Sequence, residues 1–193
     1  MGYYRADFDV VGVDIKPQPR YPFPFVQGDA LEYCAAHGAE FDVIHASPPC
    51  QAYSLGASRW NNEYVDLLGL TEETLLATGK PFVIENVDRA PFTLPTITLC
   101  GIQFGLNVIR HRRFGSNILL FGMHHVASHP VRGEFVTCAG HGGNGSNSKH
   151  VWAEAMAIDW MTKTELSQAI PPAYTEYIGT QLLQALNHEH ETR

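Results

Sequence analysis

The sequence predicts an α/β fold with a largely parallel sheet, and two observations carry this prediction. Short apolar runs typical of buried strands recur in the first half of the chain, at residues 10–14, 25–26, 41–46 and 82–84. Segments with helical spacing of apolar residues lie between them, at residues 30–37 and 64–78. Strands that alternate with helices in this way usually build parallel β-α-β units.

The first two predicted strands both end in polar residues. The β-branched run Val10–Val13 closes with Asp14. The second strand, Phe25-Val26, enters the turn Gln27-Gly28-Asp29, and Asp29 is a suitable N-cap for a helix over Ala30–His37. Ligands of open α/β sheets bind beyond the carboxyl ends of strands, so both acids are candidate binding residues.

The third predicted strand, Phe41–Ala46, runs into Ser47-Pro48-Pro49-Cys50-Gln51. The two prolines fix the backbone ahead of Cys50 and remove two N–H donors. A cysteine presented at a strand end is a candidate nucleophile. The alternative is a small apolar residue in a turn, because free cysteines are usually buried and inert.

The fourth predicted strand, Phe82–Ile84, is closed by Glu85-Asn86-Val87. Beyond it, residues 101–121 hold short apolar runs around the basic cluster Arg110-His111-Arg112-Arg113. Residues 138–145 are rich in glycine and lack the GK[ST] of a phosphate-binding loop. A C-terminal helix is predicted over residues 173–186, where apolar residues recur at helical spacing.

Composition narrows the class of protein. A length of 193 residues fits one domain, and a net charge of −7 argues against nonspecific coating of nucleic acid while leaving room for a local basic cleft. Four cysteines without a CxxC pair argue against a disulfide framework and predict a reducing, cytoplasmic environment. No run approaches the roughly 18 apolar residues of a membrane span, so no membrane partner is expected.

The sequence does not predict a metal site. Cys138, His141 and the pair His124-His125 are of types that bind zinc. Their spacing fits no standard zinc finger, so we expect no metal there.

In chain order, these motifs resemble those of the DNA cytosine-C5 methyltransferase family. The specific ones are Pro48-Pro49-Cys50 and Glu85-Asn86-Val87, each placed after a predicted strand. The supporting ones are Asp14, Gln27-Gly28-Asp29, Arg110-x-Arg112 and Ala169-Ile170-Pro171-Pro172. The resemblance covers roughly Met1 to Leu186. It implies a Rossmann-like methyltransferase fold, double-stranded DNA as partner, a monomer when complete, and a bacterial or phage origin.

The resemblance implies a catalytic role for four residues. The Cys50 thiolate would add to C6 of a flipped-out cytosine, so that C5 becomes nucleophilic enough to take a methyl group. Glu85 would hydrogen-bond N3 and the exocyclic amine. Arg110 and Arg112 would reach the base and the adjacent phosphate. Without the resemblance, Glu85 would be interpreted as a solvated or capping acid.

The implied cofactor is S-adenosylmethionine. Asp14 would bind its ribose hydroxyls, and Asp29 would bind the adenine amino group. The other residues expected at the cofactor are Ile15, Ala30 and Pro48. The residues expected at the substrate are Ser47, Pro49, Gln51, Asn86 and Val87. Taken alone, Asn86 could be only a turn residue.

Two features depart from the family pattern. Val108 stands where a Gln normally opens the Arg-x-Arg element. The family's Phe-x-Gly-x-Gly-Gly loop, which cradles the methionine end of the cofactor, is absent. We expect the true start to lie upstream of Met1. The alternatives are that another segment replaces the loop, or that the chain is a non-catalytic relative that binds DNA or a partner.

The family pattern divides the chain into three parts. Residues 1–114 would form the catalytic core, and residues 158–193 would complete it. Residues 115–157 would form a short target-recognition-like insertion. Within the insertion, the Gly-rich loop 140–147 would follow the DNA backbone or be a mobile surface loop.

Overall fold

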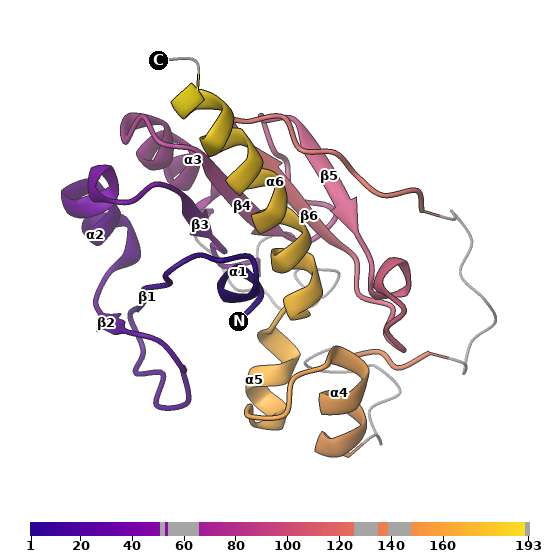
Figure 1. Cartoon of the computed structure of the whole chain (residues 1–193). Helices are drawn as coiled ribbons and strands as arrows, with labels where there is room; N and C mark the ends of the chain where they lie inside the picture. Colours follow the sequence, from indigo (N-terminus) through magenta and orange to yellow (C-terminus); the bar gives the residue numbers. More distant parts are fainter. Residues whose placement is uncertain (51–52, 54–65, 126–134, 139–147, 192–193) are drawn as a thin grey trace. The chain divides into compact units, whose positions relative to one another are not determined.

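A computed structural model of the chain describes residues 1–50, 53, 66–125, 135–138 and 148–191 (Figure 1). The chain divides into two compact units. We call the first the helical unit; it consists of Met1–Val10, Leu99–His111 and Gly122–Leu183. We call the second the sheet unit; it consists of Val11–Thr98, Arg112–Phe121 and Gln184–Arg193.

The strands belong to the sheet unit, apart from the last residue of β5. Here β1 (Gly12–Asp14) and β2 (Phe25–Gln27) form a parallel two-stranded sheet. A second sheet has the strand order β3 (Ile44–Ala46), β4 (Phe82–Asn86), β6 (Arg112–Ser116), β5 (Thr96–Leu99). The strands β3 and β4 run parallel, whereas β4 and β6 run antiparallel. The fold is therefore mixed α/β with small sheets, and the predicted Rossmann-like, largely parallel sheet is not confirmed.

The strand β6 was not evident in the sequence and changes the sheet. It begins with two arginines and contains Gly115, a pattern with low strand propensity. A Cβ atom at Gly115 would lie 2.6 Å from Cδ1 of Phe92, so only glycine fits this close approach. Pairing with β6 carries β4 beyond the predicted end at Ile84, because Glu85 and Asn86 join the ladder.

The described part of the sheet unit also contains two helices and a 3₁₀ turn, besides the end of the C-terminal helix. They are α2 (Ala30–His37), η1 (Gly38–Glu40) and α3 (Leu68–Ala77). The predicted N-cap of α2 is confirmed, since Asp29 accepts the N–H groups of the first turn. The turn η1 ends with a bond from the Phe41 N–H to the Gly38 carbonyl, and β3 consequently starts at Ile44 rather than at Phe41.

The core of the sheet unit lies between α3 and β4. Its fully enclosed members are Leu68, Leu75, Phe82, Ile84 and Ala90. Cys34 of α2 and Ile44 of β3 pack against them. Burial of each large apolar side chain contributes about 1.5–3 kcal/mol, which fixes β4 as the rigid element of this unit.

The helical unit contains α1 (Gly2–Arg5), the 3₁₀ helix η4 (Gly101–Phe104), α4 (Lys149–Met156) and α5 (Lys163–Gln168). The long helix α6 (Pro172–Glu191) starts in this unit and exceeds the predicted span at both ends. Pro172 suits a first helical position, where its missing N–H costs nothing. The core cluster is Val108, Val136, Cys138, Trp152, Ala153, Ala155, Met156, Ile158 and Leu166. Every helix in the described part of the chain is too short or too polar to cross a lipid bilayer.

Candidate active site at the ends of β3 and β4

Parallel pairing brings the carboxyl ends of β3 and β4 to the same edge of the sheet. Ala46 of β3 is in register with Ile84 of β4. Two residues further along β4, the buried Asn86 donates from Nδ2 to the Pro48 carbonyl at 3.1 Å. Its Oδ1 accepts the Val87 N–H at 2.9 Å. Asn86 thus fastens the Pro-Pro step ahead of the candidate nucleophile to the rigid strand β4.

Cys50 follows this step and is half-buried, as a nucleophile that must meet a substrate requires. Its carbonyl accepts the Tyr53 N–H at 3.0 Å. Of the neighbouring candidates, Pro49 is exposed, and the Ser47 hydroxyl lies 3.1 Å from Nε2 of His45. Gln51 lies outside the described residues.

Glu85 and Arg112 form an ion pair at the same edge. The Arg112 Nε lies 2.9 Å from Oε1 of Glu85, and the two side chains are 17% and 11% exposed. Glu85 belongs to β4 and Arg112 opens the antiparallel strand β6, so adjacent strands supply the partners. A guanidinium beside a carboxylate favours the ionised form of that carboxylate. The pair therefore holds a negatively charged acceptor close to the strand end.

Arg110 occupies a different environment, within the helical unit. The residue is only 5% exposed. Its Nη1 donates to the Cys138 carbonyl and its Nη2 to the Ser167 carbonyl, the latter at 2.8 Å. The Tyr174 hydroxyl donates to the Arg110 carbonyl at 2.7 Å. Because β6 begins only at Arg112, strand alternation does not place the two arginines on one face.

His45 is the middle residue of β3, two positions before Ser47. Burial lowers the pKa of this imidazole to about 4, so it is neutral at pH 7. Its ring centroid lies 6.5 Å from that of Phe114 on β6. His45 is in register with Val83 of the buried strand β4.

The two acids expected to bind the cofactor lie at the ends of the paired strands β1 and β2. The Asp14 carboxylate accepts from the Lys16 N–H at 2.8 Å and from Nε2 of Gln18 at 3.0 Å. Asp29 uses Oδ1 for both bonds that cap α2, which leaves its Oδ2 to accept an amino group. A carboxylate offers about four acceptor positions, so both acids keep acceptor positions beyond these bonds. Their exposed neighbours are Ile15 and Ala30.

Sequence reasoning missed Arg113, which orders the loop after β4. Its Nε donates to Oγ1 of Thr96 at 3.0 Å, and its Nη1 donates to the Ala90 carbonyl at 3.2 Å. Its guanidinium carbon lies 5.7 Å from the ring centroid of Phe92, a cation–π contact. The signal was present, because Arg113 closes the basic cluster that the Arg-x-Arg pattern only partly uses.

Sequence reasoning also missed a cysteine–histidine cluster. Cys100, His111 and His125 each offer one ligand atom, and these atoms lie within 4.8 Å of one another. Only His125 was among the zinc-ligand types noted in the sequence. Burial raises the pKa of the Cys138 thiol, and Cys138 is not a member of this cluster. His141 lies outside the described residues.

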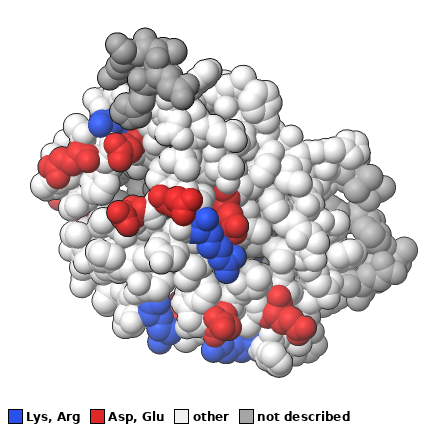
Figure 2. All heavy atoms as spheres, in the orientation of Figure 1, with Lys and Arg blue, Asp and Glu red and all other residues white. Residues whose placement is uncertain are grey.

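The surface carries charges of both signs. On the face drawn in Figure 2, Lys and Arg side chains lie in small groups among Asp and Glu side chains, not in one continuous basic surface. This pattern agrees with the net charge of −7. On this face, any attraction for nucleic acid would come from individual cations.

Comparison with known proteins gives no match to a protein-family model, a curated protein or a solved structure. The order of the sequence motifs and the geometry of the residues at the ends of β3 and β4 are therefore the evidence for function.

Proposed function

We propose that this chain transfers a methyl group from S-adenosylmethionine to C5 of cytosine in DNA, through a covalent adduct with Cys50. The observation that carries the proposal is the bond between Asn86 and the Pro48 carbonyl. It joins the two most specific sequence motifs, which are 38 residues apart in the chain, at one edge of the sheet. A nucleophile and an acid that act on one base must be held together in this way.

Each proposed step uses a named side chain. The Cys50 thiolate adds to C6 of the flipped-out cytosine, and the electron pair of the C5–C6 double bond moves to C5. The Glu85 carboxylate, oriented by Arg112, accepts the hydrogen bond of the exocyclic amine and holds the ring in place. After C5 has gained the methyl group, loss of the C5 proton to a base restores the double bond and expels the thiolate.

Cofactor binding is assigned to the edge formed by β1 and β2. When bound, S-adenosylmethionine supplies an electrophilic methyl group on a sulfonium. Asp29 would accept the adenine amino group at Oδ2, and Asp14 would accept the ribose hydroxyls. The bond from the Gly28 N–H to the Asp14 carbonyl, 3.1 Å, keeps these two acids on neighbouring strand ends.

The experiment is transfer of a tritiated methyl group from S-adenosylmethionine into unmethylated genomic DNA, which contains every short target sequence. We expect label in 5-methylcytosine with a wild-type protein that includes the expected upstream cofactor loop, and none above background with Cys50→Ser in the same protein, because a serine hydroxyl is far less nucleophilic at neutral pH. Cys34→Ser is the matched control, since Cys34 is also a half-buried free thiol. Equal transfer by Cys50→Ser and wild type would overturn the nucleophile assignment.

One observation favours a second function, that of a non-catalytic relative that binds DNA or a partner. Among the described residues, no ladder joins the sheet that bears Asp14 to the sheet that bears Glu85. Calorimetry separates the two proposals. The catalytic function requires S-adenosylmethionine binding that weakens in Asp29→Ala, whereas the alternative requires DNA binding without any response to the cofactor.

A further inference from the structure

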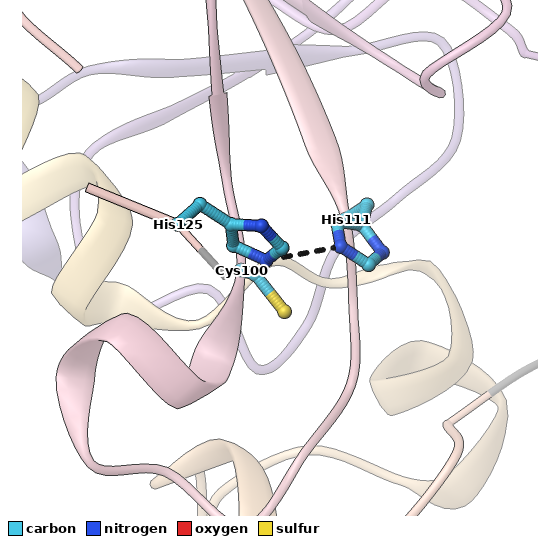
Figure 3. A group of neighbouring side chains, drawn as sticks. All are labelled: Cys100, His111 and His125. Carbon is cyan, nitrogen blue, oxygen red and sulfur yellow. Dashed lines mark hydrogen bonds between the residues drawn. The ribbon is translucent and has the colours of Figure 1, made fainter. Parts of the chain in front are cut away.

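The cysteine–histidine cluster of the helical unit brings together three separate segments (Figure 3). Cys100 follows β5 and caps the 3₁₀ helix η4. His111 immediately precedes β6, and His125 lies in the segment after β6. In Figure 3 the two imidazoles face each other, with the sulfur of Cys100 beside them. None of these residues takes part in the proposed methyl transfer.

We propose that Cys100, His111 and His125 form a binding site for a zinc ion. The distance between the two Nε2 atoms is 3.3 Å. Two imidazole nitrogens bound to tetrahedral zinc at about 2.05 Å would lie roughly 3.3 Å apart, so the histidines already have the required separation. The same geometry places a thiolate roughly 3.6 Å from each nitrogen. The three ligand atoms lie within 4.8 Å of one another, so the sulfur needs to move only slightly toward the nitrogens.

The donor set suits zinc. One thiolate and two neutral imidazoles form a mixed soft and borderline ligand set, which excludes calcium and magnesium. Cys100 is fully buried, and the two histidines are partly exposed. A metal ion could therefore reach the cluster from the histidine side. Three protein ligands leave the fourth tetrahedral position to a water molecule.

The surrounding bonds hold the ligands in place, as the partners of metal ligands do in known sites. Gln103 accepts the Cys100 N–H at 2.7 Å and donates to the Met123 carbonyl at 2.9 Å. One side chain thus ties the cysteine to the segment that carries His125. The first residue of η4 must be the glycine Gly101, because a Cβ there would lie 2.3 Å from the Val108 carbonyl oxygen.

Without a metal, the same contact is a hydrogen bond in which one Nε2 donates and the other accepts. The two interpretations differ in the role of the thiol. Zinc requires a deprotonated Cys100 and releases a proton on binding, whereas a histidine pair does not involve the sulfur. The test therefore measures whether the Cys100 sulfur binds the metal ion.

The experiment titrates Co²⁺ into the chelator-treated, reduced full chain. We expect one Co²⁺ per chain, with a thiolate-to-cobalt charge-transfer band, the visible bands of tetrahedral coordination and displacement by one equivalent of Zn²⁺. The affinity should fall at least ~100-fold in His125→Gln and His111→Gln, and the charge-transfer band should vanish in Cys100→Ala. His124→Gln, a change in the exposed neighbour of His125, should bind like the wild type.

Three results would overturn the site. The first is a wild-type chain that takes up no Co²⁺ at micromolar concentration. The second is a tetrahedral spectrum without a thiolate band, which would place the ion elsewhere. The third is wild-type affinity in His125→Gln. Circular dichroism checks the fold of each variant, and if the buried change Cys100→Ala prevents folding, the partly exposed His125→Gln decides the question alone.

Discussion

Arg110 and Arg112 are two residues apart, but their guanidinium groups have different partners and different burial. Around Arg110, the guanidinium is buried and bonds two backbone carbonyls from distant segments of the helical unit. Around Arg112, the guanidinium pairs with a carboxylate at a strand end of the sheet unit. The first arrangement ties chain segments together. The second holds a reactive group in position.

The two arginines of one Arg-x-Arg pattern therefore have two different roles. A buried arginine on neutral carbonyls is part of the fold, because its loss would leave both acceptors unsatisfied. An arginine on a partly buried carboxylate orients a charge that substrate can use. We therefore expect substitutions of Arg110 to act mainly on stability and substitutions of Arg112 to act mainly on the proposed activity.

The largest effect on stability is expected from Arg110→Met. The change removes two charge-assisted hydrogen bonds and leaves the buried Cys138 carbonyl and the partly buried Ser167 carbonyl without these donors. We expect a loss of about 4 kcal/mol in the free energy of unfolding, measured by urea denaturation. Arg5→Met is the matched control, since its ion pair with Glu176 is exposed and 3.5 Å long, and its loss should cost less than about 1 kcal/mol. A smaller effect at Arg110 than at Arg5 would contradict the comparison.

Arg112→Gln should have a smaller effect on stability and a larger one on activity. Glu85 is left without its ion-pair partner in a partly buried site, which costs about 2 kcal/mol. Methyl transfer should fall at least ~100-fold, because the carboxylate loses its orientation. In a double-mutant cycle, Glu85→Gln added to Arg112→Gln should restore part of the stability and none of the transfer. Additive losses in stability would show that the pair is not coupled.

His45 gives the region at the strand ends a pH dependence. Its pKa is 6.5 in the unfolded chain and about 4 in the folded one, so the unfolded chain binds the proton more readily. The resulting loss in the free energy of unfolding is nearly absent above pH 6.5. It grows as the pH falls and levels off below about pH 4. We expect it to reach about 1–2 kcal/mol between pH 7 and pH 5. In His45→Gln, this part of the change in the free energy of unfolding with pH should disappear, as measured by urea denaturation at several pH values. An unchanged dependence on pH would place His45 in a solvated environment.

Tyr174→Phe is expected to have the smallest effect. The change deletes only the hydroxyl that donates to the buried Arg110 carbonyl at 2.7 Å. Loss of one such bond costs about 1 kcal/mol in the free energy of unfolding. Thermal denaturation measures the difference, and Tyr177→Phe, a change in a partly exposed residue of the same helix, is the control. Methyl transfer by Tyr174→Phe should equal that of the wild type, since the hydroxyl belongs to the region of Arg110.

The sequence predicted well the features that depend on local chemistry. The N-cap Asp29, the apolar run of β4 and the helix after Pro171 all follow from neighbouring residues, and all three are confirmed. The strand β6 could not be predicted, because Gly115 is there to accommodate Phe92, a contact made far along the chain. That strand also makes the sheet mixed, which the spacing of the apolar runs did not indicate.

The candidate site was predictable in part. The motifs around Cys50 and Glu85 identified the strand ends, but the partner of each side chain depends on tertiary contacts. The different environments of Arg110 and Arg112 depend on where β6 begins. The cluster of Cys100, His111 and His125 has no recognisable spacing, since segments from three parts of the chain form it.

The most direct test of the central claim is covalent trapping on DNA that contains 5-fluorocytosine. Fluorine at C5 cannot leave as a cation, so elimination of the thiol stalls after methyl transfer. In the presence of S-adenosylmethionine, we predict a denaturation-resistant protein–DNA adduct, with mass spectrometry locating the base on the peptide that carries Cys50. The adduct should form equally in Cys34→Ser and be absent in Cys50→Ala. An adduct that persists in Cys50→Ala, or one located on another cysteine, would contradict the account.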